Sequence, residues 1–262
     1  DGSSVSCPTA SLPGVGTGLR WSIGVARATS PPLVFGSFAA PHITWVSVTT
    51  LATSGVVPGN AFDLVGTNFA GLGATPAVAR LVYPLSPGGP TSYALVGCTV
   101  VTAFTRVRCT RHDPGVGNPV FAYLTFGGQT NMYSPTLSFV APTLLSVRAP
   151  GTLATVGGDL VSLFGSNFGP SCGVSGGANC NNVVATYTRG SVSTSTGLRI
   201  VYSPAQCAVV SDTQITCVAM PGTGANHVWN VTVGSQRAAG SGSAAVGTTS
   251  YTPPGVGAYA GP

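Results

Sequence analysis

The chain has 262 residues, enough for two domains of ordinary size and part of a third. Only 6% of the residues are charged, Lys and Glu are absent, and the net charge of +5 is spread thinly, which argues against a nucleic-acid-binding surface. The 37 Gly and 21 Pro favour short strands and turns over long helices, and together with Arg they interrupt every apolar run before it is long enough to span a membrane.

The first recognisable element is the segment PGVGTGLRWSIGVA, residues Pro13 to Ala26. Related segments start at Pro114 and at Pro221, each with a Pro-Gly-x-Gly motif followed by an alternating strand. Because Pro fixes φ at the second position of a type II turn and Gly supplies the positive φ at the third, the motif predicts such a turn.

The strand after the third motif has a clear two-residue period. Trp229, Val231 and Val233 alternate with Asn230 and Thr232. We therefore expect the first three side chains to be buried and Asn230 to be exposed.

Five pairs of segments recur with a period of a little over one hundred residues, which is too long for a solenoid unit and suits one β-sandwich. The matching segments are Pro41–Val48 and Pro142–Val147, Phe62–Phe69 and Val161–Phe168, Cys98–Cys109 and Cys207–Cys217, Pro114–Gln129 and Pro221–Gln236, and Leu137–Pro142 and Thr249–Pro254.

Seven Cys in a chain poor in His and acidic residues indicate disulfides and an oxidising, extracellular setting. The repeat and the spacing predict the pairs Cys98–Cys109 and Cys207–Cys217, and a third pair, Cys172–Cys180, brackets a Gly-rich loop. Cys7 remains, as an unpaired thiol or an intermolecular link. No C-x-x-C pair is present, so a zinc site is not expected.

These motifs, in this order, resemble the IPT/TIG domain, an immunoglobulin-like fold shared by plexins, some receptor ectodomains and some transcription factors. Its Gly-Thr/Ser-Asn-Phe turn is found at Gly66–Phe69 and at Gly165–Phe168. The resemblance implies an all-β chain of tandem immunoglobulin-like sandwiches. It implies little about function, because such domains are mostly structural or interaction modules.

The domain organisation predicted in this way has four parts. Residues 1–40 match the second half of a domain, since Trp21 aligns with Trp229. Residues 41–141 and 142–254 form the first and second complete domains, and residues 255–262, with Tyr259, form a C-terminal tail. The sequence leaves three explanations for the half domain: an array whose missing half lies upstream, completion by another subunit, or an extended arm whose match is coincidental.

Completion by another subunit favours head-to-tail assembly by strand addition, because a half sandwich exposes unpaired edges. The side chains expected to dock are Trp21, Ile23, Val25 and Phe38, which form an apolar row. The expected partners are therefore copies of the same chain.

No catalytic site is expected. Gly173–Gly177 fits the G-x-S-x-G pattern of hydrolases but lies in a Gly-rich loop between two Cys. The five Asp are isolated, and His42, His112 and His227 are scattered over different elements. We expect no enzyme activity, no cofactor and no bound metal. The Arg cluster at residues 106–111 is interpreted as an exposed strand face rather than a phosphate site.

Covalently attached sugars fit a surface so poor in charge. Asn230 starts the single Asn-x-Thr/Ser acceptor sequence of the chain. The stretches rich in Ser, Thr and Pro at residues 29–32, 191–196 and 248–254 are candidates for O-linked sugars, or plain loops.

The sequence thus predicts the structural protomer of a secreted or cell-surface filament, assembled by strand complementation. The alternative is a ligand-binding or adhesion fragment of a receptor-like ectodomain.

Overall fold

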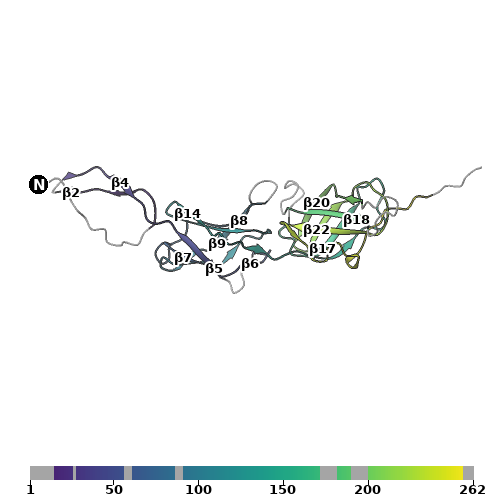
Figure 1. Ribbon diagram of the computed structural model, residues 1–262, viewed down its shortest axis with the longest axis horizontal. Coiled ribbons are helices and arrows are strands. Elements are labelled where there is room, and N and C mark those ends of the chain that lie inside the picture. Colours follow the sequence, from purple (N-terminus) through teal and green to yellow (C-terminus); the bar gives the residue numbers. More distant parts are fainter. Residues whose placement is uncertain are drawn as a thin grey trace, which may run out of the picture.

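The computed structural model describes residues 15–25, 28–55, 61–85, 91–171, 182–189 and 200–255. Three parts follow one another in a row (Figure 1). They are named here the N-terminal segment (residues 15–40), the first sandwich (41–141) and the second sandwich (142–255). In the described residues, no helix is both long enough and apolar enough to cross a membrane.

The N-terminal segment contains two short antiparallel ribbons. Strand β1 (Leu19–Trp21) pairs with β4 (Leu33–Gly36), and β2 (Gly24–Val25) pairs with β3 (Ala28–Thr29). In the described residues, each ribbon has only two strands.

The first sandwich consists of two antiparallel sheets and one parallel strand pair. The four-stranded sheet has the order β10 (Thr99–Thr102), β11 (Arg106–Cys109), β7 (Phe62–Thr67), β5 (His42–Val46). The five-stranded sheet has the order β12 (Arg111–His112), β9 (Thr91–Val96), β8 (Val78–Tyr83), β13 (Phe121–Phe126), β14 (Gln129–Met132). The parallel pair is β6 (Thr50–Leu51) with β15 (Ser138–Phe139).

The second sandwich repeats this plan. One sheet has the order β16 (Thr143–Arg148), β17 (Leu160–Ser166), β21 (Gln214–Val218), β20 (Gln206–Ser211). The other has the order β19 (Val201–Tyr202), β18 (Val184–Arg189), β22 (His227–Val233), β23 (Gln236–Arg237). A parallel bridge between Leu153 and Tyr251 stands where β6 and β15 pair in the first sandwich.

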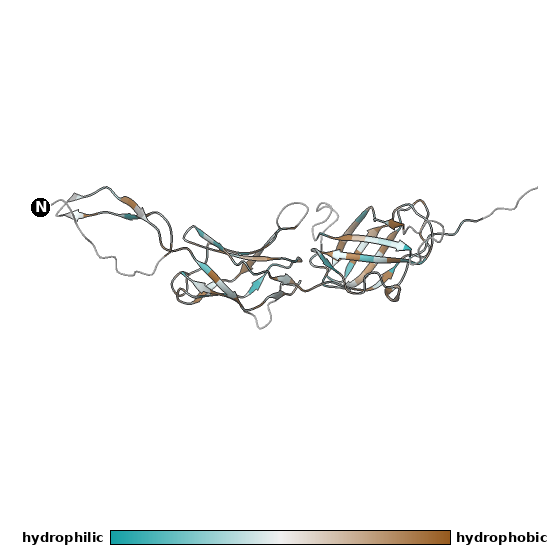
Figure 2. Ribbon diagram, in the orientation of Figure 1, coloured by the Kyte–Doolittle hydropathy of each residue, from teal (hydrophilic) through white to brown (hydrophobic). Residues whose placement is uncertain are grey.

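Each sandwich has its own apolar core, which follows from the alternation along its strands. In β7, Phe62 and Leu64 are fully buried, and in β22, Trp229 and Val231 are fully buried. Figure 2 shows apolar residues along the strands of both sandwiches. The predicted all-β, immunoglobulin-like fold is confirmed. In the described part of the chain, the short 3-10 turn η2 (Ala244–Val246) is the one helical element.

A disulfide joins neighbouring strands at the same place in each sandwich. Cys98 is bonded to Cys109, with Cα atoms 3.9 Å apart, and Cys207 to Cys217, with Cα atoms 4.1 Å apart. Cys7, Cys172 and Cys180 lie outside the described residues.

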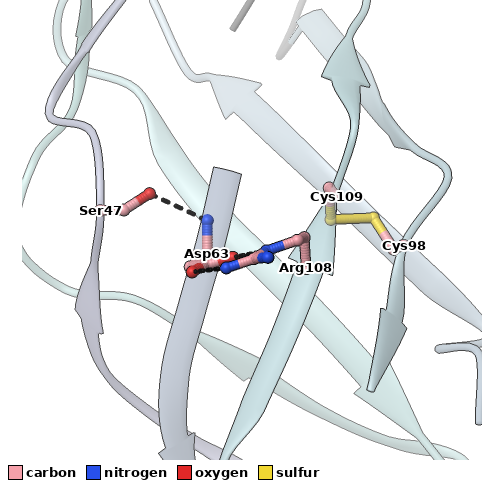
Figure 3. Close-up of polar contacts among 5 residues, drawn as sticks. All are labelled: Ser47, Asp63, Cys98, Arg108 and Cys109. Carbon is pink, nitrogen blue, oxygen red and sulfur yellow. Dashed lines mark hydrogen bonds and ion pairs between the residues drawn. A yellow bond between two sulfur atoms is a disulfide. The ribbon is translucent and has the colours of Figure 1, made fainter. Parts of the chain in front are cut away.

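One ion pair lies next to the first disulfide (Figure 3). The Arg108 guanidinium donates two hydrogen bonds to the Asp63 carboxylate, at 2.8 and 2.9 Å, and the Asp63 amide donates to the Ser47 hydroxyl at 2.9 Å. The hydrogen bond from Arg108 lowers the pKa of Asp63. Arg106 and Arg108 lie on the exposed face of β11, as the sequence predicts.

Replacing both Cys207 and Cys217 by Ala is expected to lower the free energy of unfolding of the second sandwich by about 3 kcal/mol. The disulfide closes a short loop. Its removal increases the conformational entropy of the unfolded chain, which corresponds to roughly this loss of stability. Urea titration of the double variant under non-reducing conditions measures the change. An unfolding free energy equal to that of the parent would contradict it.

Candidate functional site

The most distinctive feature of the structure is a contact that occurs twice. The Pro-Gly-x-Gly loop of one part touches the next part at the turn between two strands, β13 and β14 or β22 and β23. The first junction joins the N-terminal segment to the first sandwich, and the second junction joins the two sandwiches. Both junctions therefore link neighbouring parts of the chain.

Two glycines pack backbone to backbone in each junction. In the second junction, Gly117 and Gly234 have φ values of 139° and 55°, and a Cβ on Gly234 would lie 2.6 Å from the Gly117 nitrogen. In the first junction, Gly16 and Gly127 have φ values of 126° and 53°, and a Cβ on Gly127 would overlap the Gly16 backbone. A side chain at the hairpin glycine would therefore push the two parts away from each other.

A glutamine two residues after the hairpin glycine holds the other side of each junction. The Gln236 side chain donates from Nε2 to the Phe139 carbonyl oxygen at 3.0 Å, and the Phe139 amide donates to the Gly117 carbonyl oxygen at 3.0 Å. These bonds satisfy both backbone groups of Phe139, as partly buried polar groups require. The first junction repeats both bonds, at 2.9 and 3.0 Å, with Gln129, Phe38 and Gly16.

The loop also contributes a valine to the core of the next part. Val116 is 3% exposed and belongs to the core of the second sandwich, although it precedes that sandwich in the chain. Val15 packs in the same way against the core of the first sandwich. Burying a valine fully contributes roughly 1.5–3 kcal/mol, so Val116 ties its loop to the second sandwich, while the half-buried Val15 contributes less.

A tyrosine of the first sandwich holds the Pro-Gly-x-Gly loop in place through hydrogen bonds. The Tyr93 hydroxyl donates to the Val116 carbonyl oxygen at 2.8 Å and accepts from the Val116 amide at 3.3 Å. Burial raises the pKa of Tyr93, which keeps its hydroxyl protonated as a donor.

The predicted type II turn is wrong at Pro114 and Pro221, and the one at Pro13 lies outside the described residues. The positive φ belongs to the second glycine of the motif, as at Gly117, while Gly115 has no such φ. A Cβ on Gly115 would lie 2.5 Å from the Tyr93 ring. The first glycine is therefore needed for the close approach of a tyrosine, which the sequence pattern did not indicate.

The Gly-x-Asn-Phe turns contact the linkers between parts. Asn68 has a φ of 59° and donates from Nδ2 to the Ala40 carbonyl oxygen at 3.0 Å. Asn167 has a φ of 61° and donates to the Ala141 carbonyl oxygen at 3.1 Å. Each turn thus holds the residue that leads into β5 or β16.

The second junction has further polar contacts. The Tyr83 hydroxyl lies 2.6 Å from the Ser235 hydroxyl of the hairpin turn, and Asn182 donates from Nδ2 to the Tyr83 hydroxyl at 2.8 Å. These three side chains join β8 of the first sandwich to the second sandwich.

In each sandwich a buried histidine lies against the aromatic residue of the C-terminal parallel pairing, named here the exit strand, which contains Phe139 in β15 or Tyr251 in the bridge to Leu153. His112 and His227 are each 1% exposed, and their rings lie 5.6 Å from Phe139 and 5.4 Å from Tyr251. Burial lowers the pKa of both imidazoles, and each Nδ1 lies within hydrogen-bond distance of a backbone carbonyl oxygen. Both are therefore neutral parts of the core.

The structure separates the residues predicted to dock. Phe38 belongs to the first junction, as described above. Trp21 and Ile23 lie in the N-terminal segment and are 38% and 45% exposed, respectively. Val25 lies in β2, and its side chain is outside the description.

Glycosylation stays a prediction, but Asn230 is half-buried and not exposed as the alternation predicts. Its Oδ1 accepts a hydrogen bond of 3.0 Å from Arg237, which also donates to the Ser241 carbonyl oxygen. The loop after β23 therefore covers part of this strand face. Residues 173–177 and 191–196 lie outside the described residues.

The sequence repeat matches Pro114–Gln129 with Pro221–Gln236. It does not indicate that the glutamine at the end of each segment binds the preceding part. The signal was the glutamine itself, since an exposed turn does not require Gln at the same position twice.

Gly127→Ala is expected to release the N-terminal segment, because the new Cβ would overlap Gly16. Gly128→Ala is the matched control: Gly128 also has positive φ, 79°, but has open space around it. Both variants carry similar backbone strain, so their difference isolates the contact. Hydrogen exchange at the Phe38 amide should accelerate at least tenfold in Gly127→Ala relative to Gly128→Ala. Equal exchange rates would contradict the contact.

Stability is expected to decrease as the pH falls below 6.5, the ordinary pKa of histidine. Because His112 and His227 have lowered pKa values when folded, the unfolded chain binds more protons in this range. The slope is at most about 1.4 kcal/mol per pH unit for each histidine. Chemical denaturation between pH 7.5 and 5 measures it, and a double His→Gln variant should have a smaller slope. A parent stability independent of pH over this range would refute the assignment.

Comparison with known proteins gives one family match: the IPT/TIG domain model matches residues 142–251. No curated protein matches the chain. Two solved structures are similar at 16% identity: the extracellular region of plexin A4 (TM-score 0.31; 81% of this chain and 18% of that chain) and SGBP-B from a xyloglucan utilization locus in Bacteroides uniformis (TM-score 0.28; 76% and 48%). The chain thus spans less than half the length of either protein. Both TM-scores are below 0.5, so neither likeness extends the family match.

Proposed function

With residues 142–251 being an IPT/TIG domain, we propose that this chain is a structural part of an extracellular rod that assembles into a filament. IPT-like modules are joined end to end in the rod, and copies of the chain associate through the N-terminal segment. The protein has no enzymatic role in this proposal. The disulfides and the family match fit an extracellular or surface protein.

The observation that carries the proposal is the repetition of the junction. Two glycines, a glutamine and a valine make the same contacts between different pairs of neighbours. A flexible linker would need none of them. Repeated contacts of this kind support a fixed relation between successive modules, which is the property that a rod requires.

The N-terminal segment supports association between copies. Its β1–β4 ribbon has only two strands, and such a ribbon is marginally stable without an opposing sheet. Leu33 and Val34 of β4 are 72% and 58% exposed. Strands from another copy would cover these residues and pair with the ribbon edges, and a head-to-tail contact of this kind produces an open filament.

Leu33→Asp is expected to abolish filaments of the full chain, because a charge would then lie in the interface. Leu72→Asp is the control, since Leu72 is equally exposed, 72%, but lies in the first sandwich. Negative-stain electron microscopy should show filaments for the parent and the control, and separate rods for Leu33→Asp.

Separate rods for the parent as well would refute the filament and favour the alternative, an adhesion or ligand-binding ectodomain. Short, bent particles for the parent would refute the rod.

A further inference from the structure

The second sandwich has an end face built from the same parts as the two junctions. This end face consists of the Thr223–Gly224 loop, Tyr251 and Thr252–Pro254, and it surrounds a hollow of about 560 Å³. The described part of the chain places no hairpin on it. Thr223 and Gly224 correspond to Val116 and Gly117, and Tyr251 corresponds to Phe139.

The loop of the end face has the geometry of an occupied junction. Gly224 has a φ of 99°, and its carbonyl oxygen accepts from the Tyr251 amide at 2.8 Å. The Tyr202 hydroxyl donates to the Thr223 carbonyl oxygen at 3.2 Å and accepts from its amide at 3.3 Å. Tyr93 holds Val116 in the same way, so the loop is preorganised for a neighbour.

The Tyr251 carbonyl is directed away from its own sheet. In the parallel bridge to Leu153, the hydrogen bonds use the Ser250 carbonyl and the Thr252 amide, at 2.7 and 2.8 Å. The Tyr251 amide donates to the Gly224 carbonyl oxygen, as described above. The equivalent carbonyl of Phe139 accepts from Gln236. The end face therefore presents an acceptor at the position where each junction has a glutamine donor.

We propose that the end face binds a further IPT-like module that presents a Gly-x-Gln hairpin. This module follows Thr252–Pro254 in tandem in the same chain. The hairpin glycine packs on Gly224, and the glutamine amide donates to the Tyr251 carbonyl. The inference rests on the rod proposed above and identifies the chemistry of its next member.

A second copy of the chain does not supply this hairpin from its N-terminal segment. The pairing of Val25 with Ala28 corresponds to the pairing of Val233 with Gln236, with two residues in between in both cases. Ala28 thus stands at the glutamine position, and Ala26 at the glycine position. An alanine side chain cannot donate to the Tyr251 carbonyl.

The end face also differs from the junctions at one residue. Thr223 is exposed and stands where Val15 and Val116 enter a core. Threonine has nearly the shape of valine, but burying its hydroxyl without a partner costs free energy. Contact at the end face is therefore weaker than at the second junction, and Thr223→Val is expected to strengthen it.

The test extends the full chain by repeating residues 143–255 directly after Pro254, as residue 143 follows Pro142. The readout is hydrogen exchange at the Ala225 amide. Its equivalent, Asn118, donates to the Gly234 carbonyl oxygen at 3.0 Å in the second junction. Ala225 exchange is expected to slow at least tenfold in the extended chain. Gln236→Ala in the appended copy should reverse this, and Thr223→Val should slow exchange further.

The Asn118 amide of the same molecule is the internal reference. A protected Asn118 with an Ala225 rate equal to that of the unextended chain would overturn the inference and leave the rod proposal standing. An unprotected Asn118 would instead refute the rod proposal itself. Protection of Ala225 that rises with concentration in the unextended chain would show a second copy on the end face and overturn the tandem assignment.

Discussion

The close approach of two glycine backbones is the constraint on which the architecture depends. Gly117 and Gly234 meet without side chains between them, which brings the hairpin turn to the exit strand of the preceding sandwich. Only at that separation can the Gln236 amide reach the Phe139 carbonyl and Val116 enter the next core. The three contacts are therefore not independent, because each requires the geometry that the glycines permit.

One consequence is that the core of the second sandwich includes a residue of the first. Val116 belongs to one sandwich by its place in the chain and to the next by its burial. Tyr93 of the first sandwich holds Val116 by a hydrogen bond, so folding of the first sandwich positions a core residue of the second. Stability in such an array depends on neighbours as well as on each module.

The fold could be predicted from the sequence because it is encoded locally. Alternation such as that at Trp229, Val231 and Val233, together with the repeated Cys and Asn-Phe motifs, predicts strands and their order. The junction could not, because it depends on contacts between residues far apart in the chain. Gln129 and Gln236 look like ordinary turn residues until Phe38 and Phe139 are placed beside them. Asn230 was misjudged for the same reason, since the covering loop is held by Arg237.

The parallel pairing of β6 with β15 has a mechanical meaning. The chain leaves the first sandwich along β15, so tension along the proposed rod would pull this strand lengthwise past its neighbour. Its hydrogen bonds to Thr49 and Leu51, at 2.9 and 2.8 Å, and those of Phe139 to both sides of the second junction are then loaded in shear. Bonds loaded in this way share the force and break together rather than one after another. In the proposed rod, the exit strand would therefore transmit pull between modules through bonds that resist it together.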